Sequence, residues 1–141
     1  MPRPPLSPEA LELALAPNPA VLATVRDDGS PHTVAVWFDW VEDRVLLNMD
    51  VKRKRLRYVE ANPNASITIL DGENWHRQLT VRGPISLEPD EGLVTVDRLA
   101  RRYIGADYPI RDRPRVTAWL RPEHWFLWDA RGRGLRPQSA R

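Results

Sequence analysis

Three short apolar runs follow one another near the start of the chain, and a turn signal separates each run from the next. They occupy residues 20–26, 31–40 and 45–49, and many of their side chains are β-branched or aromatic, which favours strands. Residues 27–30 (DDGS) lie between the first two runs, and Asp-Gly is a strong signal for a hairpin. Three strands joined by such short turns are predicted to form an antiparallel meander.

The second of these runs is apolar on both of its faces, whereas a strand with one face in water alternates between apolar and polar residues. One face carries Val34, Val36, Phe38 and Trp40, and the other carries Ala35 and Trp37. Such a strand is covered on both sides, as in a barrel whose outer wall is also packed.

The rest of the chain continues this pattern of short elements. Ser7 followed by Pro8 is typical of a helix start, and Pro17 ends that helix. Further helices are predicted at 52–61 and 90–104, and further strands at 66–70, 75–87, 116–120 and 124–128. Residues 1–141 are therefore predicted to be one mainly β domain, an antiparallel barrel of six to seven strands with short appended helices. Residues 1–19 are its N-terminal arm with a short helix, and residues 130–141 are expected to be a flexible tail.

The composition excludes several classes of protein. The chain has no cysteine, so it has no disulfide framework, no thiolate nucleophile and no cysteine-ligated zinc or iron–sulfur site. It has no apolar run of about 18 residues that could span a bilayer, and no secretory signal. We therefore expect a cytoplasmic protein without a membrane partner. The net charge of +2 is too small to indicate nucleic acid by itself.

Residues for protein-based catalysis are hard to find in this sequence. His32, His76 and His124 are scattered at no metal-ligand spacing, so no metal site is predicted. No serine has the context of a nucleophile elbow, and most carboxylates lie in turns. We therefore predict no catalytic residue, and a hydrolase is a poor interpretation.

The strongest positive signal is a basic run where the third strand gives way to a helix. Lys52, Arg53, Lys54 and Arg55 follow one another there, and they include both lysines of the chain. Cations in the first turn oppose the helix dipole, whereas an anion bound at the same place is stabilised. Two interpretations stay open: the cluster binds a phosphate, or it is a solvated basic face.

Six tryptophans are many for 141 residues. They either pack in the core and a dimer interface or form a wall for a flat aromatic ligand. A cationic cluster beside an apolar, aromatic barrel wall suits a phosphorylated planar cofactor.

Three segments, taken together, resemble a known family. They are the hairpin LATVRDDGSPHTVAVWF (22–38), the strand, basic cluster and helix of LLNMDVKRKRLRYVEANPNASI (46–67), and WHRQLTVRG (75–83). In this order and spacing they are similar to the split β-barrel flavin and deazaflavin oxidoreductases of the pyridoxamine-phosphate-oxidase-like superfamily. The resemblance covers about residues 20–90 and implies an FMN-binding split-barrel fold.

The resemblance also implies roles for individual residues. The family's phosphate-binding pair falls on Lys54 and Arg55, and Lys52 and Arg53 extend it. The remaining cofactor contacts would come from the second strand, the end of the third strand and the fifth strand, at Val36, Trp37, Asn48, Met49 and Gln78. The family often has Ser or Thr where this chain has residues 48–50 (NMD), and the C-terminal Arg/His motif of the vitamin-B6 oxidases is missing. The resemblance thus favours a short branch that uses the deazaflavin F420, with FMN as the alternative, over the B6 oxidase itself.

The expected function is an F420- or FMN-dependent oxidoreductase that transfers hydride to a small conjugated substrate. The family's members are homodimers with cofactor sites at the interface, so we expect a homodimer. One alternative is a carrier or sensor that binds the cofactor without turnover. A more remote alternative is a small barrel that binds nucleic acid through the basic run and exposed aromatic residues, and we expect no such partner because acidic residues flank that run.

Overall fold

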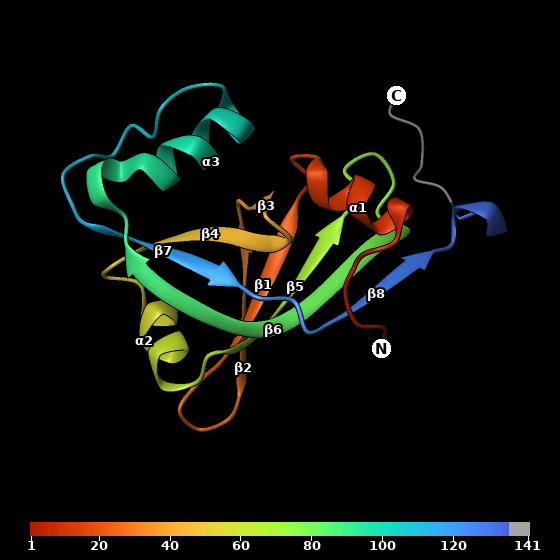
Figure 1. Ribbon diagram of the computed structural model, residues 1–141, viewed down its shortest axis with the longest axis horizontal. Coiled ribbons are helices and arrows are strands. Elements are labelled where there is room, and N and C mark those ends of the chain that lie inside the picture. Colours follow the sequence, from red (N-terminus) through yellow and green to blue (C-terminus); the bar gives the residue numbers. More distant parts are fainter. Residues whose placement is uncertain (136–141) are drawn as a thin grey trace.

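The computed structural model describes residues 1–135, which form a mainly β structure with three α-helices (Figure 1). The strands are β1 (Ala20–Val25), β2 (Pro31–Val36), β3 (Asp39–Val41), β4 (Arg44–Asp50), β5 (Asn64–Leu70), β6 (Arg77–Pro89), β7 (Arg115–Leu120) and β8 (His124–Asp129). The helices are α1 (Pro8–Leu15), α2 (Lys54–Ala61) and α3 (Val94–Ile104), with 3-10 turns at Glu91–Leu93 and Arg131–Arg133. The predicted mainly β antiparallel class is confirmed. Part of the predicted flexible tail forms the second 3-10 turn, and residues 136–141 lie outside the described part.

The described residues contain eight strands because the predicted second strand is interrupted. β2 ends at Val36, and β3 begins at Asp39. Between them the chain crosses from one end of the strand order to the other, and Phe38 is fully buried on the way. The continuous apolar run is therefore not one strand covered on both faces, but two strands and a buried corner.

The strands pair in the order β2-β1-β5-β6-β7-β4-β3, and β8 pairs with β6 beside this path. β6 is long enough to pair with β8 through residues 77–82 and then with β7 through residues 85–89. Gly83 lies at the change of partner, where a Cβ atom would collide with the carbonyl oxygen of Arg121. β2 and β3 are the two ends of the path and do not pair with each other, so the barrel is split there.

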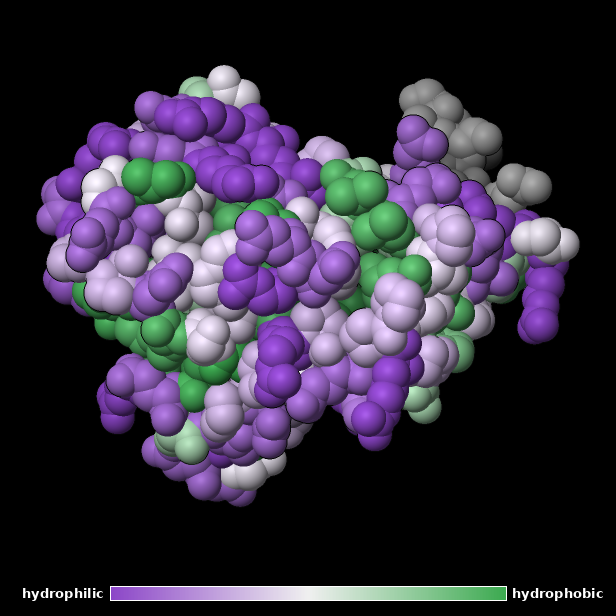
Figure 2. Space-filling model, viewed as in Figure 1, coloured by the Kyte–Doolittle hydropathy of each residue, from purple (hydrophilic) through white to green (hydrophobic). Residues whose placement is uncertain are grey.

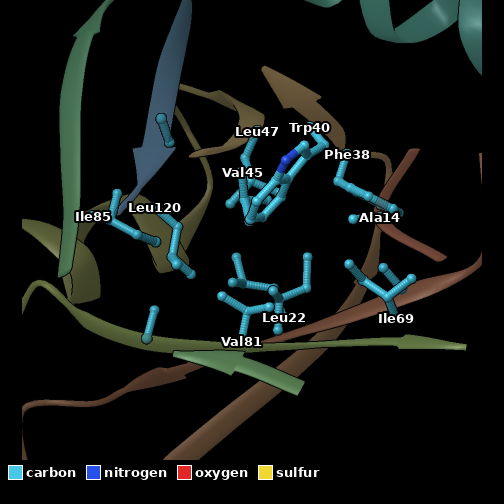
Figure 3. Packing of buried hydrophobic residues seen from close by; sticks show 14 of the residues in the cluster. Ala14, Leu22, Phe38, Trp40, Val45, Leu47, Ile69, Val81, Ile85 and Leu120 are labelled. Carbon is cyan, nitrogen blue, oxygen red and sulfur yellow. The ribbon is translucent and has the colours of Figure 1, made fainter. Parts of the chain in front are cut away.

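Apolar side chains from nearly every strand fill the interior (Figure 3). Leu22, Ile69, Val81 and Leu120 point into this core and are fully buried. Each such side chain contributes roughly 1.5–3 kcal/mol by leaving water. The core thus packs against strands on both sides of the split.

The helices begin and end close to the predicted positions. The Ser7 hydroxyl accepts a hydrogen bond from the Ala10 amide and caps α1, and Gly105 ends α3 with a left-handed backbone (φ 71°). α2 begins at Lys54, two residues later than predicted, with Arg53 at its N-cap. No described helix is long and apolar enough to cross a membrane.

Candidate functional site

A cavity of about 710 Å³ lies beside the split of the barrel. β3 pairs only with the first part of β4, so the edge of residues 48–50 has no partner strand on that side among the described residues. β2, β4, the start of α2, one side of α3 and the α3–β7 loop (residues 105–114) all contribute side chains to the cavity wall. In Figure 2 the surface over α3 is mostly hydrophilic, and hydrophobic surface is visible beneath that helix.

One part of the wall is aromatic. The rings of Trp37 and Tyr103 stack with centroids 5.8 Å apart and planes at 10°, and Tyr108 meets Trp37 edge-on. The Tyr103 hydroxyl donates to the carbonyl of Asn18 at 2.7 Å, and burial raises the pKa of this hydroxyl above its ordinary value. Tyr103 is therefore a neutral, fixed wall residue at physiological pH, and the wall offers a flat apolar surface.

Another part of the wall is cationic, with Arg53, Arg55, Arg113 and Arg115 around the single carboxylate of Asp50. Arg113 Nη1 donates to Asp50 Oδ2 at 3.0 Å, and the backbone amide of Lys52 donates to Asp50 Oδ1 at 2.9 Å. Burial acts to raise the pKa of Asp50, but these two donors together hold it below its ordinary value. Asp50 is therefore ionised and pairs with Arg113, which leaves the other three arginines without a carboxylate partner among residues 1–135.

Arg55 is the most exceptional of these cations. Its Nε is buried and has no hydrogen-bond partner among the described residues. Burial, followed by repulsion from Arg53 and Arg115, lowers the pKa of Arg55 below its ordinary value. An unsatisfied buried donor costs about 1–3 kcal/mol in proteins, and a charged one costs more. The cluster therefore fits an anion such as a phosphate, which would pair with this donor.

The structure brings five of the nine predicted cofactor-binding residues to the cavity wall: Val36, Trp37, Asn48, Arg53 and Arg55. The other four lie elsewhere. Lys52 and Lys54 are exposed and do not line the cavity, and Met49 belongs to the core with 1% of its surface exposed. Gln78 lies on β6 opposite Trp128, and its Nε2 donates to the carbonyl of Trp75.

Sequence reasoning missed the residues that come from beyond position 100. Tyr103, Tyr108, Arg113 and Arg115 all line the cavity. Tyr103 keeps the helical spacing of the apolar residues in α3, which indicates packing and not a site, and no motif marks the loop before β7. The alternation of arginine at 111, 113 and 115 in front of a strand was the available signal, since period two places 113 and 115 on one side of an extended chain.

Comparison with known proteins gives a consistent result. The family model described as pyridoxamine 5'-phosphate oxidase matches residues 6–129. A solved F420 reductase is 32% identical over 87% of this chain and 98% of its own, with a TM-score of 0.74. No curated protein matched the sequence.

Two further solved structures share the fold at lower identity. A conserved hypothetical protein from Mycobacterium tuberculosis is 22% identical over 98% of this chain and 93% of its own, with a TM-score of 0.75. A haem-binding protein from Mycobacterium smegmatis is 22% identical over 90% of this chain and 55% of its own, with a TM-score of 0.69. Together with the strand order and the family match, these likenesses confirm the resemblance found in the sequence. The chain belongs to the pyridoxamine 5'-phosphate oxidase family and has its split-barrel fold.

Proposed function

We propose that this protein is an oxidoreductase that binds F420, or alternatively FMN, and transfers hydride to a small conjugated substrate. The observation that carries the proposal is the unpaired, partly buried guanidinium of Arg55 next to an aromatic cavity. The 32% identity to an F420 reductase over most of both chains favours the deazaflavin. The absence of a free carboxylate or histidine on the described wall agrees with chemistry carried by a cofactor.

Arg53 and Arg55 would hold the phosphate of the cofactor. They lie at the first turn of α2, where the amide groups and the helix dipole add positive potential. Lys52 and Lys54 are exposed next to this cluster and would attract an acidic ligand at longer range. Arginine binds phosphate through two parallel donors, so the two arginines can fix both the position and the orientation of the group.

Trp37, Val36 and Tyr103 would bound the ring system of the cofactor. When bound, F420 or FMN supplies the hydride-transfer chemistry. The loop residues Tyr108 and Ile110 line the same cavity and would exclude water from the reacting region. The protein's contribution is thus binding, orientation and water exclusion, and no side chain needs to act as a nucleophile.

A homodimer is part of the proposal. β8 pairs with β6 and with no other strand among the described residues, and its outward side chains include Phe126 and Trp128, which are 50% and 37% exposed. Aromatic residues exposed together on a sheet are typical of interfaces. Gln78 lies opposite Trp128 on the same face, so in a dimer it would approach the partner rather than its own cavity. Light scattering of the wild type and of Trp128→Glu measures this: a dimer is expected for the first and a weakened dimer for the second, whereas a monomeric wild type contradicts it.

Titration of the purified protein with F420 and with FMN tests the central claim. Micromolar or tighter binding of one of them is expected, and binding of neither overturns the proposal. Steady-state turnover with the reduced cofactor and a panel of quinones and enones then tests the reaction. Binding without any turnover would contradict the enzymatic part and favour a carrier or sensor.

A further inference from the structure

Arg115 has a geometry that the binding of a cofactor phosphate does not explain. This residue begins β7, directly across from Asp50 of β4, and its side chain lines the cavity. Its Nε donates to Asn48 Oδ1 at 2.6 Å, and neither Nη group has a protein acceptor in the described part of the chain. The two Nη groups form the end of the guanidinium that suits a carboxylate, because they present two parallel donors.

A relay of hydrogen bonds holds Arg115 in this orientation. Asn48 Nδ2 donates to Asp90 Oδ2 at 2.9 Å, so both ends of the Asn48 amide are in use. Asp90 in turn is buried and accepts from the amides of Thr95 and Val96 at the start of α3, at 2.9 and 3.0 Å. Asn48 is therefore suited to position Arg115, in addition to lining the cavity as one of the predicted cofactor-binding residues.

The charges on the cavity wall leave Arg115 in excess. Asp50 pairs with Arg113, so these two cancel. The phosphate monoester of FMN carries roughly −1.5 to −2 at pH 7, which matches Arg53 and Arg55. The positive charge of Arg115 then needs one further negative charge, and a carboxylate supplies one.

Aromatic rings surround this remaining cation. The guanidinium of Arg115 lies 4.7 Å from the ring centroid of Tyr108, which meets Trp37 edge-on. A ligand beside Arg115 therefore has flat apolar surfaces next to its charged group. Resting on the proposed function, we propose that Arg115, positioned by Asp90 and Asn48, binds the carboxylate of a planar conjugated substrate.

Benzoate and benzamide test this inference, because they share a planar ring and differ in the charge. Their affinities are measured by tryptophan fluorescence on cofactor-free protein and by the visible spectrum on cofactor-loaded protein. We expect benzoate to bind the wild type at least tenfold more tightly than benzamide. Arg115→Gln should bring the ratio close to one, and Asn48→Leu should lower it several-fold. Arg121→Gln is the matched control: this arginine is exposed and lies off the cavity wall, so the ratio should not change.

Two results overturn the inference: a wild-type ratio near one, or a ratio that Arg115→Gln leaves unchanged. The ratio of FMN to riboflavin affinity separates the two anion sites, since only FMN has the phosphate. Arg115→Gln should preserve that ratio, and its collapse would place Arg115 in the phosphate site and overturn the inference.

If Arg115→Gln does not fold, Arg115→Lys replaces it, with a reduced benzoate preference as the expected result and an unchanged one as the contradiction. If neither cofactor binds, the proposed function fails, while benzoate binding to the cofactor-free protein still decides the role of Arg115.

Discussion

Arg102 and Arg55 are both partly buried arginines on helices, yet they use their guanidinium groups in opposite ways. Arg102 donates to the carbonyls of Phe38, Leu15 and Ala16 at 2.9, 3.0 and 2.7 Å and reaches that of Ala14 at 3.4 Å. It thereby satisfies the last carbonyls of α1, which has no basic residue in its own last turn. Arg55 leaves its buried Nε unpaired among the described residues.

The same contrast separates two regions of the molecule. Around α1, β3 and α3, arginines are paired with protein acceptors, as in the contacts of Asp39 with Arg98 and Arg102. Around the cavity, four arginines face a single carboxylate, that of Asp50, among the described wall residues. Many arginines of this chain therefore need no ligand to explain them, whereas Arg53, Arg55 and Arg115 line the cavity without a carboxylate partner among residues 1–135.

The largest effect on stability is expected in the first region. Arg102→Ala removes the donor of several carbonyl groups at once, and an unsatisfied buried acceptor costs about 1–3 kcal/mol. We expect the free energy of unfolding, measured in urea, to fall by about 3 kcal/mol. The loss should not reach the full sum over the carbonyls, because water can reach some of them. Arg102→Lys should recover less than half of this loss, since one ammonium cannot reach acceptors spread around a guanidinium. A loss below ~1 kcal/mol would mean that the hydrogen bonds of Arg102 do not stabilise the fold, and the contrast with the arginines of the cavity would fail.

The next effect is on cofactor binding and should not lower the stability of the fold. Arg55→Gln removes one charge-assisted contact to phosphate, worth about 1.5–3 kcal/mol, so FMN or F420 affinity should fall about 10- to 100-fold. Riboflavin has no phosphate, and its affinity should stay the same. The free energy of unfolding should not decrease, because burial and the neighbouring cations already disfavour the charge of Arg55.

Arg57→Gln is the control for this variant, since Arg57 is on the same helix, exposed and off the cavity wall. It should change neither affinity. Equal losses for FMN and riboflavin in Arg55→Gln would mean that Arg55 does not bind the phosphate.

The two regions also differ in how far the sequence predicts them. The β1–β2 hairpin, the Ser7 cap and the basic start of α2 could be predicted because each depends on residues close together in the chain. The predicted three-strand meander is wrong, because β2 pairs with β1 while β3 and β4 pair at the other end of the strand order. The break after Val36 could not, because it depends on where Phe38 finds a place in the core.

The site shows the same limit. Arg53 and Arg55 were found from the basic run, but Arg115 joins them only because β7 pairs with β4. The resemblance implies a cofactor contact for Met49. The two-residue period of a strand instead places Asn48 and Asp50 on one face and Met49 on the other. Structure confirms the second arrangement, since Met49 lies in the core.

A smaller effect, and one that depends on pH, concerns the loop that closes the cavity. Asp97 on α3 accepts from Arg111 Nη1 and Nη2 at 2.8 and 3.1 Å and from the Tyr108 amide at 3.0 Å. Chiefly through the hydrogen bonds from Arg111, and against the opposing effect of burial, the pKa of Asp97 lies below its ordinary value of 3.8. Its stabilising contribution is therefore present above pH 3.8 and is lost as the pH falls through the lower folded value.

Asp97→Asn should consequently be less stable than the wild type at pH 7, by less than Arg102→Ala. The difference between the two urea midpoints should narrow below about pH 4. Faster proteolysis of the variant within residues 105–114 at pH 7 would locate the loss in the loop. A difference that is constant from pH 7 to pH 3 would show that the ion pair does not hold the loop.

The smallest effect is expected at Lys54, which the resemblance paired with Arg55 as a phosphate ligand. Lys54 is exposed and does not line the cavity, so it can act on an anionic ligand only through the screened field of its charge. Lys54→Gln should lower cofactor affinity less than about threefold at 0.15 M salt, and the difference should vanish at 1 M salt, where the Debye length is about 3 Å. Removing this cation from the first turn of α2 should also raise the free energy of unfolding by about 0.3–1 kcal/mol, since it opposes the helix dipole. A loss of affinity as large as that of Arg55→Gln would mean that Lys54 also contacts the bound ligand. The exposure of a cation in the ligand-free protein would then not distinguish binding residues from other surface residues.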